Sequence, residues 1–263
     1  MSDEIKDDVI IETTKAVASD VYKDAFQPAL KAAGSIIALP LQIVDAALSG
    51  PKLWVTEKQY NYERTKELLA EKMKDTPPEK IVPPDNYVAV PALQQISYCF
   101  DSDELRDMYA NLLAASMHED KKWEIHPAFV DIIKQLTPDE AKLLKALPPS
   151  LNAGYPILAV HSKGKKSYKV ILINFTDIAD GICDKPQNIS AYLENLDRLK
   201  LIELGTGAVL ADESQYDRLK NTPTIKRITG SKLPKGRVYD YQKGAFRLSS
   251  FGLSFVNTCI LGK

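Results

Sequence analysis

The chain has few cysteines, and their arrangement excludes two classes of small protein. Its 263 residues include three, Cys99, Cys183 and Cys259, which lie far apart and form no CxxC pair. The sequence therefore predicts neither a zinc ribbon nor a disulfide framework. All three have apolar neighbours, so we expect buried free thiols in a reducing compartment.

Long apolar runs are also missing. No stretch of about 18 uncharged apolar residues occurs, so no membrane-spanning helix is expected. The N-terminal sequence MSDEIKDDVI is acidic and has no basic segment before an apolar core, which argues against a secretory signal. Both absences favour a cytoplasmic protein.

The familiar catalytic motifs are absent. There is no HExxH, no GxSxG, no Walker loop and no GxGxxG. The segment GTGAV at 205–209 has too few glycines for a dinucleotide site, and we interpret it as a turn. From these absences we expect a protein that is not an enzyme and that uses no cofactor.

Three histidines are present, and two of them lie close to acidic residues. His118 and His126 are eight residues apart, near Glu119, Asp120 and Glu124. A metal site needs three or four ligands that converge from rigid elements. His126 precedes a proline at the start of an expected helix, which suits a capping or loop role better. We expect no metal site here.

Charge is unevenly distributed along the chain. Residues 1–150 carry 17 Lys/Arg and 25 Asp/Glu, a net charge of −8, whereas residues 151–263 carry 17 and 10, a net charge of +7. Halves of opposite charge indicate two domains that choose different partners or attract each other.

Residues 4–75 are expected to be helical almost throughout, and GSIIALPLQIVDAALSG at 34–50 is apolar nearly all round. A helix over 34–48 would be about 22 Å long, short of a hydrocarbon core of about 30 Å. It is either a central helix of a bundle or a segment that lies on a membrane surface. The residues of this candidate membrane-contact segment are Ile36, Ile37, Leu39, Leu41, Ile43, Val44 and Leu48.

Five prolines within 76–91 predict an extended connector. Three helices with short links follow, an antiparallel bundle by default. Asp101 with Glu104, and Thr137 with Glu140, have the spacing of capping boxes. The expected buried faces comprise Leu105, Met108, Leu112 and Ala115 in the first helix and Phe129, Ile132, Ile133 and Leu136 in the second.

The turn-rich segment 147–154 is the expected domain boundary. The pattern after it predicts strands at 155–160 and 168–175, a helix and short strand over 186–204, a helix over 211–221, a long basic loop over 222–237, two strands around Gln242–Gly244, and a final helix over 251–260. The order helix, strand, hairpin, helix is that of a winged helix. The predicted fold is mainly α with a smaller α+β part: a helical bundle at 1–148, then a winged-helix-like domain at 152–263.

From about residue 34 onward the chain resembles the abortive-infection alpha family of bacterial proteins associated with phage defence. Whole blocks carry the likeness: PPEKIVPP, PALQQISYCFDSDELRDMYANLLAASM, IHPAFVDIIKQLTPDEAKLLKAL, ISAYLENLDRLKLIEL and GAFRLSSFGLSFVNTCI. The resemblance implies an α-helical N-terminal region and a role in host defence. It supplies no catalytic residues.

Two surfaces are candidates for partner binding. The exposed face of the second winged helix is expected to carry Glu194, Asn195, Asp197 and Arg198. Two acids against one base disfavour contact with a polyanion, so this face suits a protein partner. The second surface is a nucleic-acid patch on the expected basic loop and wing, made of Lys226, Arg227, Lys232, Lys235, Arg237, Lys243 and Arg247.

The hypothesis that the sequence favours is a non-enzymatic, cytoplasmic abortive-infection component. It would act through a protein partner, with a phage-encoded partner as one option and contact to a membrane surface as a further option. The alternative is a nucleic-acid-binding regulator that uses the basic wing.

Overall fold

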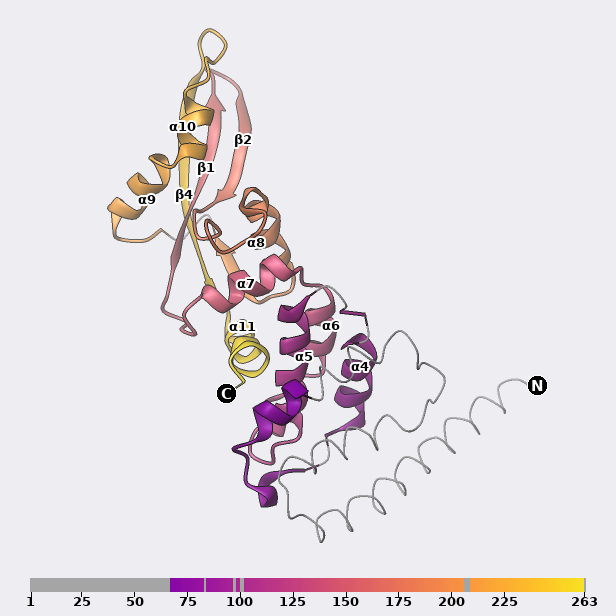
Figure 1. Ribbon diagram of the computed structural model, residues 1–263. Coiled ribbons are helices and arrows are strands. Elements are labelled where there is room, and N and C mark those ends of the chain that lie inside the picture. The colour runs from indigo at the N-terminus through magenta and orange to yellow at the C-terminus, as the bar shows by residue number, and fades with distance from the viewer. Residues whose placement is uncertain (1–66, 83, 97, 100–101, 206–208, 263) are drawn as a thin grey trace, which may run out of the picture. The chain divides into compact units, whose positions relative to one another are not determined.

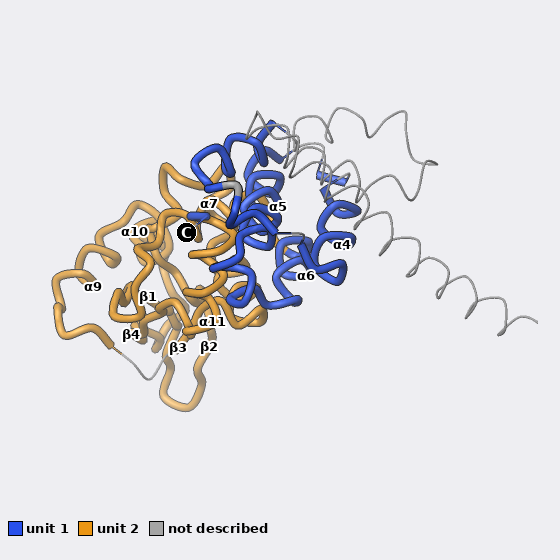
Figure 2. The backbone as a smooth tube through the Cα atoms, turned by 90° about the horizontal axis from the view of Figure 1, so that it is seen from below, with its two compact units in different colours: residues 1–135, 261–263 blue, residues 136–260 orange. Residues whose placement is uncertain are grey.

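The computed structural model describes residues 67–262, apart from 83, 97, 100–101 and 206–208. The chain divides into two compact units (Figure 2): residues 1–135 with 261–263, and residues 136–260. The candidate membrane-contact segment, Ile36 to Leu48, lies outside the described residues. Of the described helices, none is long and apolar enough to cross a membrane.

Unit 1 is helical in its described part. Residues 67–73 are helical and place Leu69 and Met73 in the core. Three α-helices follow, and each of them contacts the other two. The elements are η1 (Pro78–Lys80), α4 (Asn86–Ile96), α5 (Asp103–Ser116), η2 (Lys122–Glu124) and α6 (Ala128–Lys134).

The N-terminus of α5 differs from the expected one. Ser102, not Asp101, is the N-cap: its side chain accepts a hydrogen bond from the Leu105 backbone N–H at 3.2 Å. Glu104 binds the Ser102 hydroxyl at 3.1 Å. The expected box between Asp101 and Glu104 was one residue out of register, because Ser and Asp are both good caps and stand side by side.

The Pro-rich connector is shorter than expected. It was predicted to run to residue 91, but α4 begins at Asn86 and contains Pro91. Val88 and Ala92 of this helix are buried, so burial of an apolar face outweighs the local cost of the proline. Before α4, Ile81 forms a bridge with His118, which fixes the remaining connector along the end of α5.

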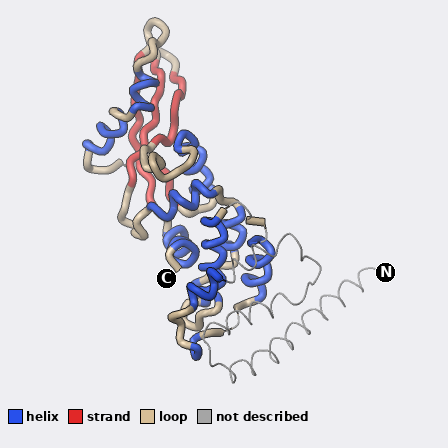
Figure 3. Tube along the Cα trace, viewed as in Figure 1, coloured by secondary structure: helices blue, strands red, loops and turns tan. Residues whose placement is uncertain are grey.

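Unit 2 is an antiparallel sheet with helices around it (Figures 1 and 3). The strand order is β2-β1-β4-β3. The helices are α7 (Pro138–Ala146), η3 (Pro186–Asn188), α8 (Ile189–Arg198), α9 (Glu213–Lys220), α10 (Pro223–Thr229), α11 (Ser250–Phe255) and the π-helix η4 (Val256–Ile260). The strands are β1 (Tyr155–Lys163), β2 (Tyr168–Phe175), β3 (Ile202–Gly205) and β4 (Val238–Leu248).

Helix α7 belongs to this unit. Its capping box formed as predicted: Thr137 accepts from the Glu140 N–H, and the Glu140 side chain accepts from the Thr137 N–H. The helix contacts α8 and η4, and for that reason the units divide at 135/136 and not at the predicted turn over 147–154. The sequence has a turn at both places, and contacts across the fold decide between them.

The hairpin predicted around Gln242–Gly244 is wrong. Residues 238–248 form one continuous strand, β4, which pairs with β1 over nine residues and with β3 at its end. Gly244 serves close packing, not a turn. A Cβ there would lie 2.8 Å from the Gly205 carbonyl oxygen and 3.1 Å from Ile157. The described sheet therefore has no wing at this position.

The predicted basic loop over 222–237 is also wrong in its first half. Residues 223–229 form α10, with Thr222 as N-cap and Pro223 at the first helical position. These are standard start signals. The helix is short, and its buried residue is Ile225, so it shows little apolar periodicity in the sequence.

Candidate nucleic-acid interface

One end of the unit 2 sheet is built from β1, β2 and β4 together. The register pairs Lys163 with Tyr168 and Val238, and His161 with Val170 and Asp240. Cross-strand partners share a face, and side chains alternate along a strand. These six residues therefore lie on one face, whereas Ser162, Lys169 and Tyr239 lie on the other.

Arg237 holds two loops together at this end. Its Nε donates to the Ser162 hydroxyl and its Nη1 to the Ser167 hydroxyl, both at 2.6 Å. Its Nη2 donates to the Ser162 carbonyl oxygen. The guanidinium fork thus ties the segment before β4 to the turn between β1 and β2. Gly236, at φ 82°, gives the backbone the left-handed conformation that this approach requires.

Helix α10 is fixed to the same end by Tyr239. The Tyr239 hydroxyl lies 2.7 Å from the Ile228 carbonyl oxygen and 2.8 Å from that of Ser231. Lys226 and Arg227 are in the last turn of this helix and are exposed. Cations are favoured there by the helix dipole, so their position is also locally stable.

We call residues 161–169 and 222–240 the basic end. It contains nine Lys or Arg residues and one acid, Asp240. Asp240 lies 3.6 Å from Lys163, and Arg237 is occupied by serines. Seven exposed cations are left without an acidic partner among the described residues: Lys165, Lys166, Lys169, Lys226, Arg227, Lys232 and Lys235.

Five of the seven residues of the predicted patch lie in the basic end. The other two lie outside it, and each is paired with an acid. Lys243 forms an ion pair with Glu213, and Arg247 pairs with Glu203 at 2.8 Å. Arg237 is within the basic end, but its N–H donors are used by Ser162 and Ser167, so its role is to hold the loops together. The sequence interpretation had assigned all three to a free cationic surface because a hairpin was expected there.

Sequence reasoning missed the lysines of the β1–β2 turn. Lys163, Lys165 and Lys166 lie between the strands expected at 155–160 and 168–175, and Lys169 lies within the second of them; none was named as a candidate. The available signal was four lysines in seven residues without an acid. What the sequence did not show was that the segment before β4 lies beside this turn, since that contact depends on Arg237.

The predicted protein-docking face on α8 is partly used inside the unit. Asn195 donates to Glu140 Oε1 at 2.8 Å, and Asp197 accepts from the Leu204 N–H at 3.2 Å. Glu194 is exposed and accepts from Asn174 at 3.3 Å. Arg198 is exposed and donates to Asn195. Two of the four residues thus have structural roles.

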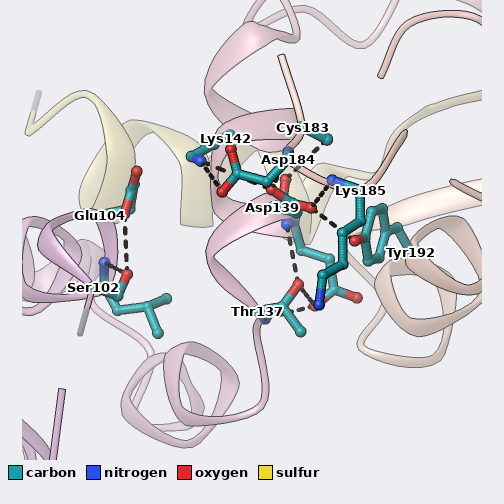
Figure 4. A network of polar contacts seen from close by, with 11 residues as sticks. Ser102, Glu104, Thr137, Asp139, Lys142, Cys183, Asp184, Lys185 and Tyr192 are labelled. Atoms are coloured by element: carbon teal, nitrogen blue, oxygen red, sulfur yellow. Dashed lines mark hydrogen bonds and ion pairs between the residues drawn. The ribbon is translucent and has the colours of Figure 1, made fainter. Parts of the chain in front are cut away.

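A second polar cluster surrounds Asp139 on α7 (Figure 4). Its carboxylate accepts hydrogen bonds from the backbone N–H groups of Asp184 at 2.8 Å and Lys185 at 2.9 Å, and from the Tyr192 hydroxyl at 2.8 Å. Lys142 lies 3.8 Å away. Burial opposes ionisation, but these donors outweigh it and hold the pKa of Asp139 below its ordinary value.

The neighbours of Asp139 are kept neutral. Burial, with the nearby Asp139 carboxylate, raises the pKa of the Cys183 thiol to about 11. Burial and the hydrogen bond to Asp139 raise the pKa of Tyr192 to about 12. A protonated thiol is a poor nucleophile. The cluster anchors the loop before η3 to α7, and its geometry gives no reactive group.

The two histidines near acids serve local turns. His118 Nδ1 accepts from the Asp120 N–H at 3.2 Å, and His126 Nδ1 accepts from the Ala128 N–H at 3.1 Å. Burial and then Lys121 lower the pKa of His118. Within the described residues, no group of three or more His, Cys, Asp or Glu side chains is placed to hold a metal ion.

The comparison with protein families identifies the chain. The sequence model described as abortive infection alpha matches residues 57–259, which is most of the chain and includes all of the basic end. The chain belongs to the abortive-infection alpha family. The family's description associates it with abortive infection, a bacterial defence against phage.

Other comparisons add little to this assignment. No curated protein matches this abortive-infection alpha chain. Among solved structures, an uncharacterized protein from the hydrocarbon-degrading marine bacterium Alcanivorax borkumensis SK2 is 19% identical, over 53% of this chain and 94% of that chain. Its TM-score of 0.33 is too low to support an inference.

Proposed function

We propose that this abortive-infection alpha protein acts by binding and not by catalysis, and that the basic end of unit 2 binds nucleic acid. The observation that carries the proposal is the group of seven exposed cations without an acidic partner among the described residues. Nucleic acids are polyanions that bind to such a surface, because each phosphate that a cation neutralises releases a bound counterion.

The construction of the basic end supports a binding role over a merely solvated surface. Like charges repel, so gathering them at one end lowers the stability of the fold. A binding function would explain why the charges are kept together. Arg237 and Tyr239 nevertheless hold the turn between β1 and β2, the segment before β4 and helix α10 together. Elsewhere in unit 2, the exposed cations Arg218 and Arg247 pair with Asp177 and Glu203.

A mobility-shift titration tests the proposal. The full chain is mixed with single-stranded and duplex oligonucleotides at low salt and at about 100 mM salt. We expect binding that weakens as salt rises. If neither kind of oligonucleotide binds at either salt concentration, the proposal is wrong.

A protein partner is the second candidate function, and a feature of unit 1 favours it. Tyr87 and Val90 on α4, and Tyr98 after it, are large apolar side chains that are exposed. They are three and eight residues apart, which keeps the first two on neighbouring positions of one helix face. A Tyr87→Ser, Val90→Ser double variant should lose a protein partner in pull-downs from infected cells. Retention of every partner would remove this candidate surface.

A further inference from the structure

The basic end carries an apolar sheet face among its lysines. Tyr168, Val170 and Val238 lie on the same face, by their register with Lys163 and His161. They are 52%, 53% and 63% exposed. The opposite face is covered there by α10 through Tyr239. An apolar surface of three neighbouring side chains is thus left open to solvent, next to the turn that carries Lys165 and Lys166.

The ring of Tyr168 packs against the ring of His161. Its ring centroid lies 4.3 Å from that of His161, and the two planes are inclined by 32°. His161 is only 4% exposed. One face of the tyrosine ring therefore rests on a buried imidazole. Because half of the residue is still exposed, the other face of the ring is available to a ligand.

The hydroxyl of Tyr168 is fixed as well. It lies 2.8 Å from His161 Nδ1 and donates to Asp240 Oδ2 at 3.4 Å. Two anchors on the hydroxyl and one ring contact leave little rotational freedom to lose when a ligand stacks on the ring. The arrangement is a pre-organised aromatic platform.

We infer that this platform selects single-stranded nucleic acid, with an unpaired base stacked on Tyr168 and flanking phosphates held by Lys165 and Lys166 of the β1–β2 turn. The inference rests on the proposed function and deepens it. Single-strand binding sites combine a positive surface with aromatic rings, since every base has a flat face to stack. A duplex keeps its base faces inside and offers nothing to an exposed tyrosine.

An anionic membrane is the competing partner for a surface that is both basic and apolar. A membrane surface is entered by side chains that project from a loop or from one side of a helix. Here the β1–β2 turn consists of Gly164, Lys165, Lys166 and Ser167 and projects no apolar side chain. The apolar side chains stand on one face of the sheet and not at the tip of the turn, which suits a flat base better than an acyl chain.

Fluorescence anisotropy of labelled oligonucleotides tests the inference on the full chain. The wild type should bind a single strand more tightly than a duplex of the same length. Tyr168→Ala should weaken single-strand binding about tenfold, because stacking contributes about 1–3 kcal/mol per base, and should leave duplex binding nearly unchanged. Tyr168→Phe keeps the ring and loses only the hydroxyl contacts, so this matched control should bind a single strand more tightly than Tyr168→Ala does.

A crosslinking experiment gives a readout that a structural role of Tyr168 would not produce. Irradiation of the complex with an oligonucleotide containing 5-iodouracil should attach the base to the peptide that contains Tyr168, as identified by mass spectrometry. Crosslinks elsewhere, with Tyr168→Ala binding as well as the wild type, would overturn the stacking assignment. Circular dichroism confirms that each variant is folded before it is scored.

The outcomes separate this inference from the proposed function. If Lys165→Glu with Lys166→Glu leaves all binding unchanged, the nucleic-acid function itself fails. If that double variant loses binding but single strand and duplex bind equally, only the platform fails. Binding to phosphatidylcholine vesicles that contain phosphatidylserine, without binding to any oligonucleotide, would overturn both in favour of a membrane surface.

Discussion

At the scale of single residues, Arg237 is the side chain on which the basic end most depends. Removal of its guanidinium leaves the Ser162 and Ser167 hydroxyls without their partner. Hydrogen bonds to charged groups contribute about 1.5–3 kcal/mol each at most, and partial exposure lowers this. We expect Arg237→Ala to lower the free energy of unfolding by about 2 kcal/mol.

The control for Arg237 is Lys235→Ala, which removes an exposed cation from the same segment. An exposed substitution of this kind should change the free energy of unfolding by less than about 0.5 kcal/mol. Urea denaturation followed by circular dichroism compares the two. Equal effects would contradict the role given to the guanidinium fork.

Asp139 predicts a specific dependence of stability on pH. Its pKa is lower in the folded chain than in the unfolded chain. Such a carboxyl stabilises the fold fully above its unfolded pKa, about 3.9, and the contribution is lost as pH falls through the lower folded value. We expect the free energy of unfolding to fall steeply below about pH 4 for this reason.

Asp139→Asn tests the same contribution at neutral pH. The amide places a donor where the carboxylate accepts, so a buried donor loses its partner and the variant should be less stable by about 1–3 kcal/mol. Its stability should also fall less steeply in acid. The control is Asp184→Asn. It changes an exposed carboxylate but keeps the backbone N–H of residue 184, which donates to Asp139. A wild-type slope in Asp139→Asn would refute the assignment.

Local patterns of a few residues, such as capping boxes, gave the most accurate predictions from the sequence. The capping box of Thr137 and Glu140 formed as expected, because both partners lie within one turn. The box expected at Asp101 moved to Ser102 because two capping residues compete at adjacent positions. The roles of Asn195 and Asp197 were not predictable, since their partners, Glu140 and Leu204, are set by the tertiary fold.

At the scale of elements, one glycine led to the wrong prediction of a wing. Gly244 followed a glutamine and a lysine and was interpreted as a turn, yet it lies inside β4 where Gly205 and Ile157 approach the backbone. A strand interior and a turn both favour glycine over other residues, and the sequence alone does not distinguish them. Helices α8 and α9 were predicted well, because each carries a clear apolar face or polar cap.

Gly252 provides an element-scale prediction. It lies in α11, and a Cβ there would be 1.8 Å from the Leu201 carbonyl oxygen. Neither backbone segment is able to move without disturbing β3 or α11, so Gly252→Ala should destabilise the protein by about 3 kcal/mol or more. Ser250→Ala, an exposed change in the same helix, is the control. Thermal unfolding measures both, and equal melting temperatures would disprove the close contact.

At the scale of the whole molecule, the sequence predicted charge better than shape. The positive half was evident from composition, but the seven cations came together only through the approach of the β1–β2 turn to the segment before β4. If defence depends on this end, Lys165→Glu with Lys166→Glu should restore plaquing of a phage that the wild-type protein restricts. Restriction at wild-type strength by the double variant would separate defence from the basic end.

The most direct test of the central claim, that the basic end binds nucleic acid, is the salt dependence of the dissociation constant for a single-stranded oligonucleotide. Each phosphate contact contributes about 0.7 to the slope of log K against log salt, so Lys165→Glu with Lys166→Glu should reduce the slope by about 1.4. Lys134→Glu with Lys185→Glu makes the same change of charge at exposed positions outside the basic end and should leave the slope unchanged. The same slope in the wild type and both variants would contradict the account.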